Sequence, residues 1–169
     1  MKGGEIMDYK IEKTEAFKVL EKREVHSVSE NQNNRTIPEF WERAHKDGTV
    51  QKLISAAADK EYIYGICYAN PHKEESTFDY SIAVKYDGTS PVPDGFTVNE
   101  IPERTWAVFP CEGAMPEAIQ TLWHRICTEF FPSSSYEPTY EFDIEVYTDG
   151  EMTAGDYKSE IRVPVKTEN

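Results

Sequence analysis

The stretch YIYGICYA, residues 62–69, returns later in the chain as YEFDIEVY, residues 140–147. Three positions match at a constant offset of 78 residues, with Tyr62, Tyr64 and Ile66 falling on Tyr140, Phe142 and Ile144. Both stretches are rich in aromatic and β-branched residues, which is typical of β-strands. The repeated strand indicates that the chain contains two related units.

Two further segments keep nearly the same offset. Ile37-Pro38-Glu39 matches Met115-Pro116-Glu117 at 78 residues, and Phe78, Ile82 and Val84 match Tyr157, Ile161 and Val163 at 79. Three segments that hold register within one residue indicate an internal duplication. The alternative is that two similar strand–helix–strand–strand stretches arose without a shared plan.

The elements around these segments predict an α+β fold built from duplicated strand–helix–strand–strand units. The expected strands lie within 10–29 and at 62–69, 78–86, 96–101, 105–110, 140–147 and 157–165. One helix is expected to start at Thr36 as its N-cap, and a second covers residues 115–130. The polar segment 70–75 is expected to be a turn between two strands.

Length favours a single domain, because 169 residues suffice for one core and are marginal for two. The first repeat covers about residues 9–90 and the second about residues 91–166. Neither repeat can bury a sheet face alone, so we expect the halves to share a mostly antiparallel sheet with two main helices and a pseudo-twofold axis. The seam between the halves is the natural place for a central groove.

Alternation along the last two strands assigns their faces. In the final strand Ile161 and Val163 are expected to face the helices, which leaves Glu160 on the face that the helices do not cover. By the same parity, the preceding strand is expected to carry a second acidic row there, made of Glu141, Asp143 and Glu145, and Glu145 of this row is a candidate ligand-binding residue.

Candidate site residues follow from these faces. Glu160 is either a solvated carboxylate on an exposed sheet face or a carboxylate held among aromatic rings, where it could balance a ligand cation or act as a general acid or base. The aromatic candidates, each open to a plain packing role, are Trp106, Tyr64, Tyr68 and Tyr147. Phe40 and Trp41 are adjacent in a helix and cannot both point inward, so one of them is expected to face the groove.

The net charge and the cysteines exclude several classes of protein. A formal charge of −13 without any Lys or Arg cluster argues against direct nucleic-acid binding and against an acidic membrane surface. The spacing of the four His and three Cys predicts no metal site, and no motif predicts a bound cofactor. Three unpaired Cys, no signal-peptide core and no membrane-length apolar stretch predict a cytoplasmic protein.

An ordered set of short segments spans nearly the whole chain. These segments are Phe40-Trp41, 64–68, 78–84, 92–96, 101–109, Trp123, 135–137 and 159–165. Together they resemble the gyrase-inhibitor-like effector-binding domains, a small-molecule-binding module found free-standing and fused to AraC-type and MerR-type transcription regulators.

The resemblance implies a groove with a carboxylate ringed by aromatic side chains that takes hydrophobic and often cationic compounds. On the family pattern Glu160 is the acid, Trp106 fills the aromatic position after Ile101-Pro102, and Tyr64 and Tyr68 face it. Some free-standing members hydrolyse cyclopropane-bearing DNA alkylators, in which case Glu160 would be catalytic.

Three functions remain open for a chain with no residues to spare for a helix-turn-helix. The first is a free-standing protein that senses or sequesters a small molecule, and the second is a hydrolase that uses the same groove. The third is an inhibitor of a protein partner such as a DNA topoisomerase, because an acidic surface can mimic DNA.

Overall fold

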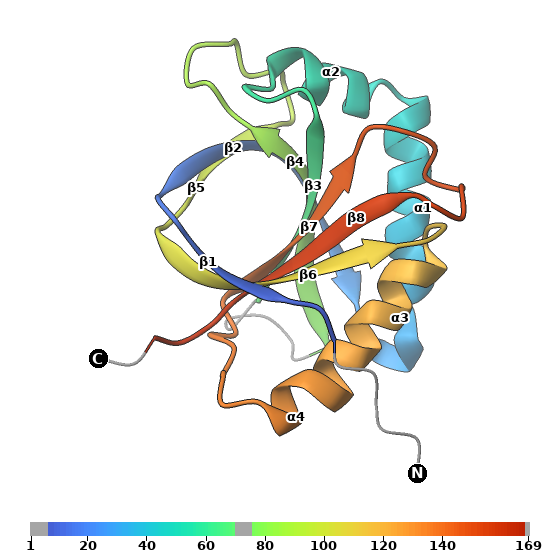
Figure 1. The fold of residues 1–169 in the computed structure, drawn as a ribbon. Helices are drawn as coiled ribbons and strands as arrows, with labels where there is room; N and C mark the ends of the chain where they lie inside the picture. Colours follow the sequence, from blue (N-terminus) through green and yellow to red (C-terminus); the bar gives the residue numbers. More distant parts are fainter. Residues whose placement is uncertain (1–6, 70–75, 168–169) are drawn as a thin grey trace.

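The computed structural model describes residues 7–69 and 76–167, so the expected turn at 70–75 lies outside the described residues (Figure 1). Eight strands form one sheet in the order β1-β6-β8-β7-β3-β4-β2-β5, with every neighbouring pair antiparallel. The strands are β1 (Lys10–Thr14), β2 (Phe17–Ser27), β3 (Tyr62–Tyr68), β4 (Thr77–Lys85), β5 (Thr97–Ile101), β6 (Arg104–Glu112), β7 (Phe142–Thr148) and β8 (Lys158–Pro164). The helical segments are the 3₁₀ turn η1 (Ser29–Asn31), α1 (Asn33–Lys46), α2 (Thr49–Ala56), α3 (Glu117–Arg125), the π-helical turn η2 (Ile126–Phe130) and α4 (Phe131–Ser133).

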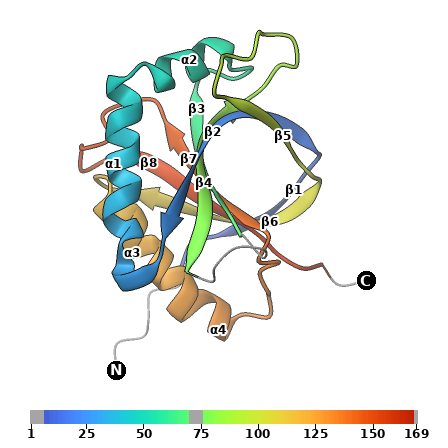
Figure 2. The same cartoon turned by 180° about the vertical axis from the view of Figure 1, so that it is seen from behind.

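The predicted α+β class is confirmed. Figures 1 and 2 show the sheet curled into a half-barrel, with α1 and α3 next to each other on its outer side. The edges of the sheet are β1 and β5. The two main helices therefore cover one face of the sheet, and the curl encloses the other.

The strand pairing shows the pseudo-twofold relation between the halves. At the centre of the sheet, Ile66 of β3 lies opposite Ile144 of β7, its own counterpart in the repeat. At the edges, β1 does not pair with the following strand β2 but with β6, and β5 pairs with β2 rather than with β6. Each half thus gives its first strand to the other half, which ties the two units into one sheet.

Apolar side chains form a core on each face of this sheet. Between the helices and the sheet lie residues such as Phe40, Leu53, Phe109 and Ile161. Inside the curl a second cluster holds Val19, Ile66, Tyr68, Ala83, Ile101, Trp106, Val108, Phe142, Ile144 and Val146. Because both faces of the sheet bury apolar residues, the helix-covered face cannot be recognised from hydrophobicity alone.

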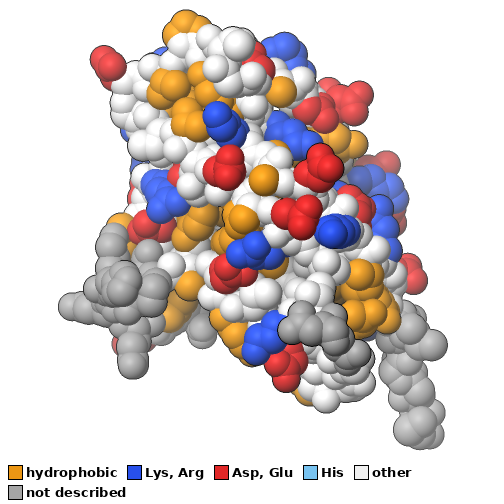
Figure 3. Space-filling view, turned by 90° about the vertical axis from the view of Figure 1, so that its left-hand side faces the viewer, with side chains coloured by type: hydrophobic (Ala, Val, Ile, Leu, Met, Phe, Trp, Pro, Cys, Tyr) orange, Lys and Arg blue, Asp and Glu red, His pale blue; other side chains and the backbone are white. Residues whose placement is uncertain are grey.

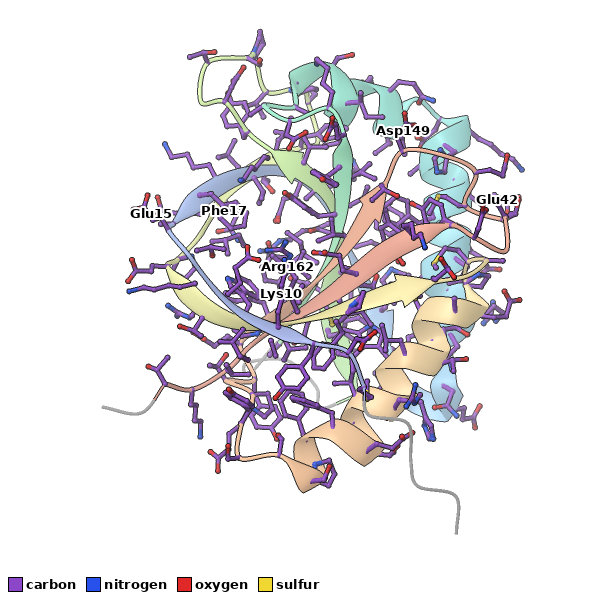
Figure 4. All side chains as sticks on the ribbon, viewed as in Figure 1. Lys10, Glu15, Phe17, Glu42, Asp149 and Arg162 are labelled. Atoms are coloured by element: carbon purple, nitrogen blue, oxygen red, sulfur yellow. The ribbon has the colours of Figure 1, made fainter. Side chains whose placement is uncertain are left out.

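The space inside the curl also contains charged side chains with close partners. Glu21 is fully buried there and accepts hydrogen bonds from the Tyr68 hydroxyl at 2.5 Å and the Ser81 hydroxyl at 3.3 Å. Figure 4 shows Arg162 of β8 in the same space, where its Nε donates to Glu160 Oε2 at 2.7 Å. These pairings offset the cost of removing polar groups from water.

The helix boundaries differ from the expected ones. Thr36 does not cap α1, which starts at Asn33; instead its Oγ1 lies 2.8 Å from Nδ1 of the buried His26. Pro38 consequently lies inside α1, where it has no N–H to donate to the carbonyl of Asn34. The expected helix at 115–130 is α3 followed by the π-helical turn η2.

Three structural facts bear on the expected absences. Within residues 7–69 and 76–167 no helix is long and apolar enough to cross a bilayer. In the same ranges no group of three or more His, Cys, Asp or Glu side chains could hold a metal ion. Cys67, Cys111 and Cys127 are free thiols.

Candidate ligand-binding site

A cavity of about 770 Å³ lies on the helix-covered face, where the two halves meet. Its walls come from α1 and α3, one helix from each half, and its floor comes from the central strands β3 and β7. Most of the exposed surface inside the cavity is apolar. Such a volume fits a compact drug-sized molecule.

Glu145 lies on the floor of this cavity and accepts three hydrogen bonds. Trp123 Nε1 of α3 donates to its Oε2 at 2.8 Å, while the hydroxyls of Tyr80 and Tyr147 donate to its Oε1 at 2.8 and 2.9 Å. All three donors are neutral, so they solvate the carboxylate without cancelling its charge. The carboxylate is therefore held in a fixed orientation by one indole and two phenols.

Trp41 of α1 completes the ring of aromatic side chains. Its Nε1 donates to the Tyr80 hydroxyl at 2.9 Å, and its ring meets the Tyr147 ring edge-on at a centroid distance of 5.0 Å. Both tyrosines are almost wholly buried, which leaves them little freedom to turn away. The helix from the first half thus fixes the donors that hold Glu145 in the second half.

Gly65 makes this arrangement sterically feasible. It pairs with Glu145 across the β3–β7 ladder. A Cβ at this position would lie 2.0 Å from the Tyr80 hydroxyl oxygen and 2.9 Å from Glu145 Oε1. Any side chain larger than hydrogen would displace the Tyr80–Glu145 hydrogen bond.

The environment shifts the pKa of both acidic groups on the floor. Burial raises the pKa of Glu145, and the hydrogen bonds from Trp123, Tyr80 and Tyr147 partly oppose that rise. Burial, followed by the nearby charge of Glu145, raises the pKa of Asp143 to about 7. Both side chains are half-buried, because protein atoms surround them on all sides except the one that faces the cavity.

A hydrogen bond joins α1 and α3 beside the cavity. Its acceptor is a backbone carbonyl that Pro38 leaves without a helical donor. The Asn34 carbonyl lacks its usual helical donor, since residue 38 is proline. Gln120 Nε2 of α3 donates to this carbonyl at 3.0 Å. The bond links the two halves beside the cavity, which both residues line.

Three of the residues expected at the site line the cavity with their side chains, namely Glu145, Tyr147 and Trp41. Tyr68 borders the cavity at the end of β3, but its hydroxyl turns into the curl and donates to Glu21. Of the adjacent pair in α1, Trp41 faces the cavity, whereas Phe40 packs against His26 and Tyr80.

The other expected site residues do not line this cavity. Trp106 is buried inside the curl, where its Nε1 donates to Thr14 Oγ1 at 2.7 Å. Tyr64 packs against the same inner cluster. Glu160 does face away from the helices, as alternation predicts, and it pairs with Arg162. The carboxylate that lies among aromatic rings is Glu145 rather than Glu160.

The expected facing of the acidic row on β7 is wrong. Glu145 lies opposite Ile161 in the β7–β8 ladder, and residues directly opposite each other share a face. Since Ile161 packs under the helices, Glu145 and Asp143 also face the helices and the cavity. The apolar residues between them, Ile144 and Val146, fill the curl instead.

Sequence reasoning missed Trp123, Tyr80 and Asp143 as site residues. Trp123 lies on the apolar face of its helix, a pattern that is typical of core packing. Tyr80 is on β4, one strand away from the seam, and it reaches Glu145 because Gly65 lies between them. The signal that could have found Tyr80 is the glycine in the middle of an aromatic strand, which marks a close approach.

A transcriptional regulator is similar in sequence to part of this chain. The transcriptional regulator BrlR of Pseudomonas aeruginosa is 29% identical over 112 residues, which cover 66% of this chain and 39% of that regulator. The chain therefore spans well under half the length of this relative.

Two solved structures share the fold over nearly their whole length. The structure of SAV2435 bound to tetraphenylphosphonium matches with a TM-score of 0.83 and 24% identity, covering 95% of this chain and 94% of that one. The integron cassette protein VCH_CASS2 from the mobile metagenome of Vibrio cholerae matches with a TM-score of 0.67 and 20% identity, covering 94% and 95%.

A family model covers the chain from the first strand to the last. It is described as Cass2, integron-associated effector binding protein, and it matches residues 10–165, which include both repeats and every residue around Glu145. This chain therefore belongs to the integron-associated effector-binding protein family.

Proposed function

We propose that this protein binds lipophilic cations in the cavity between α1 and α3, with Glu145 as the countercharge. The observation that carries this proposal is a carboxylate held deep among Trp41, Tyr80, Trp123 and Tyr147. Of the site residues expected from the sequence, Glu145, Trp41 and Tyr147 belong to this proposed site.

The chemistry of the cavity favours a cation over a neutral or anionic ligand. The described lining residues include no Lys or Arg, and the histidine among them, His45, packs against the Trp41 ring. A cation in contact with the aromatic faces gains attraction from the rings as well as from the carboxylate. An apolar ligand body would in turn cover the apolar walls.

The fold comparison supports the same ligand class. Tetraphenylphosphonium, the compound bound in the SAV2435 structure, is a cation whose charge is surrounded by four phenyl rings. A ligand of this kind combines the two features that the cavity of this protein offers, an aromatic lining and one fixed carboxylate.

A titration with tetraphenylphosphonium and with neutral triphenylphosphine oxide tests the proposal. The cation is expected to bind more tightly, and Glu145→Gln is expected to weaken its binding by about 1–3 kcal/mol because a desolvated charge pair is lost. Calorimetry gives the affinity. Tryptophan fluorescence gives a second reading, since Trp41 and Trp123 line the cavity and Trp106 does not.

Glu160→Gln is the matched control, because it removes a carboxylate from the other face of the same sheet. Tetraphenylphosphonium affinity is expected to stay within about twofold of the unmodified protein. A loss confined to Glu160→Gln would instead place the site inside the curl. Equal binding of the cation and the neutral oxide to the unmodified protein would refute the cation proposal.

A second candidate function is hydrolysis of a cyclopropane-bearing alkylator in the same cavity. It rests on the raised pKa of Glu145, which suits a general acid or base, and on its three fixed donors. Incubation with such a compound would give a ring-opened water adduct with turnover, and Glu145→Gln would lower the turnover more than the affinity. Saturable binding without product would leave the protein a binder.

The face of the protein shown in Figure 3 gives no support to a DNA-mimicking inhibitor of a topoisomerase. On that face, Lys and Arg side chains alternate with Asp and Glu, without one continuous acidic patch.

The expected cytoplasmic location remains part of this proposal. Three free thiols are compatible with a compartment in which glutathione keeps thiols reduced.

A further inference from the structure

Asp143 is a second carboxylate in the cavity, two residues before Glu145 on the same face of β7. Opposite it in the β3–β7 ladder is Cys67, whose pKa is raised by burial, so the thiol there is neutral. The protein thus places two acidic groups side by side on the floor of the cavity.

Among the described residues, three acidic ones line the cavity, and they differ in their partners. Glu141 is paired with Arg104, whose Nη2 lies 2.6 Å from its Oε2. Glu145 has its three neutral donors. For Asp143 no hydrogen bond or ion pair is found with any residue in the ranges 7–69 and 76–167.

A half-buried acidic group without a donor is costly to ionise, because burial of a polar group is normally offset by a hydrogen bond. The cavity is the open side of Asp143, and its described lining holds no Lys or Arg that could turn towards it. A ligand cation in the cavity would therefore supply the positive charge that no described Lys or Arg of the lining places beside Asp143.

The strand geometry sets the spacing of the two backbone positions that carry the carboxylates. Residues two apart on one face of a strand are separated by about 7 Å. We propose that the cavity selects a dication with an aromatic body, whose first cationic group pairs with Glu145 and whose second pairs with Asp143 at about that spacing. This inference rests on the proposed function and adds the substrate class to it.

A matched pair of phosphonium salts tests the second charge. The monocation is (4-methylphenyl)triphenylphosphonium, and the dication is (4-aminomethylphenyl)triphenylphosphonium. The ammonium nitrogen of the dication lies about 7 Å from its phosphorus, which matches the spacing of two residues along a strand. Calorimetry at about 0.15 M salt compares both ligands on the unmodified protein, on Asp143→Asn and on Asp149→Asn. Asp149 lies just beyond β7, away from the cavity lining, so it controls for the loss of one negative charge (Figure 4).

The dication is expected to bind about tenfold or more tightly than the monocation to the unmodified protein and to Asp149→Asn. In Asp143→Asn this advantage is expected to fall to about twofold or less. Titration in two buffers of different ionisation enthalpy counts protons, and the dication is expected to release more of them at pH 7, because it ionises Asp143, whose pKa is about 7. Asp143→Asn is expected to abolish that excess.

The outcomes separate this inference from the proposed function. If the monocation binds in a Glu145-dependent manner and the dication gains nothing, the cavity takes monocations and the second pairing is refuted. If the dication keeps the same affinity advantage over the monocation in Asp143→Asn, the advantage comes from the net negative charge of the protein rather than from Asp143. That result also overturns the inference. Failure of both salts to bind would overturn the inference and the proposed function together.

Discussion

Gly65→Ala is expected to lower the free energy of unfolding by about 2–5 kcal/mol and to abolish cation binding. The new methyl group would lie 2.0 Å from the Tyr80 hydroxyl oxygen and 2.8 Å from its Cζ. Tyr80 is 1% exposed and holds Trp41 as well as Glu145, so it cannot move without breaking both hydrogen bonds. Urea denaturation measures the stability, and titration with tetraphenylphosphonium measures the binding.

Gly155→Ala is the matched control for this substitution. A Cβ at Gly155 would meet nothing within 4 Å, so its effect on stability is expected to stay within about 1 kcal/mol of zero. The double variant Gly65→Ala with Tyr80→Phe removes the clashing hydroxyl and is expected to recover part of the stability without restoring full affinity. If Gly65→Ala proves as stable as Gly155→Ala, the close approach of Gly65 to Tyr80 is not present in solution.

The unliganded protein is expected to gain about 1–3 kcal/mol of stability relative to Asp143→Asn as the pH falls from 8 to 5. Burial and Glu145 raise the pKa of Asp143 in the folded state to about 7, above the value of about 4 in an unfolded chain. Its contribution is therefore fully present below the unfolded pKa and is lost as the pH rises through the folded pKa. The raised pKa of Glu145 acts in the same direction.

Cation affinity is expected to change with pH in the opposite sense. The ionised carboxylates that cost stability at pH 8 are the groups that attract the ligand, so binding should weaken as the pH falls towards 5. Denaturation midpoints and ligand titrations at pH 5, 6, 7 and 8, on the unmodified protein and on Asp143→Asn, measure both trends. Parallel stability curves for the two proteins would show that Asp143 titrates as it does in an unfolded chain.

The opposite pH trends of stability and of cation affinity have one structural cause. Asp143 and Glu145 lie beside each other in a cavity whose described lining includes no Lys or Arg, which disfavours their charged forms in the empty protein. A bound cation removes that penalty, so binding is expected to raise the denaturation midpoint most at high pH. The two buried carboxylates thus lower the stability of the unliganded protein at neutral pH, and the same carboxylates attract a cationic ligand.

Part of the site followed from the repeat. The offset between the two halves predicts a shared sheet and a cleft at its seam, and the cavity does lie between α1 and α3 over β3 and β7. Trp41 and Tyr147 were candidates because aromatic residues at the seam can serve as a lining, and Glu145 was a candidate from its place in an acidic row. The identity of the central acid did not follow.

The choice between Glu145 and Glu160 depends on which face of the sheet each strand turns to the helices. Both acids alternate with apolar residues, and both faces of the curled sheet bury apolar clusters. Alternation divides the residues of each strand between two faces. It does not say which of these two sets shares a face with which set on the neighbouring strand. The register that places Glu145 opposite Ile161 and Glu160 opposite Val146 decides it.

The sequence by itself determined the duplication, the α+β class and the seam, because strand and helix periodicities and a constant offset are properties of the linear chain. Only the tertiary structure decided that Glu145 faces the helices and meets Trp123 and Tyr80, and that Gly65 makes room for the Tyr80–Glu145 hydrogen bond. The physical reason is that these contacts join residues far apart in the chain, through the register of neighbouring strands and the curl of the sheet, which local patterns do not encode.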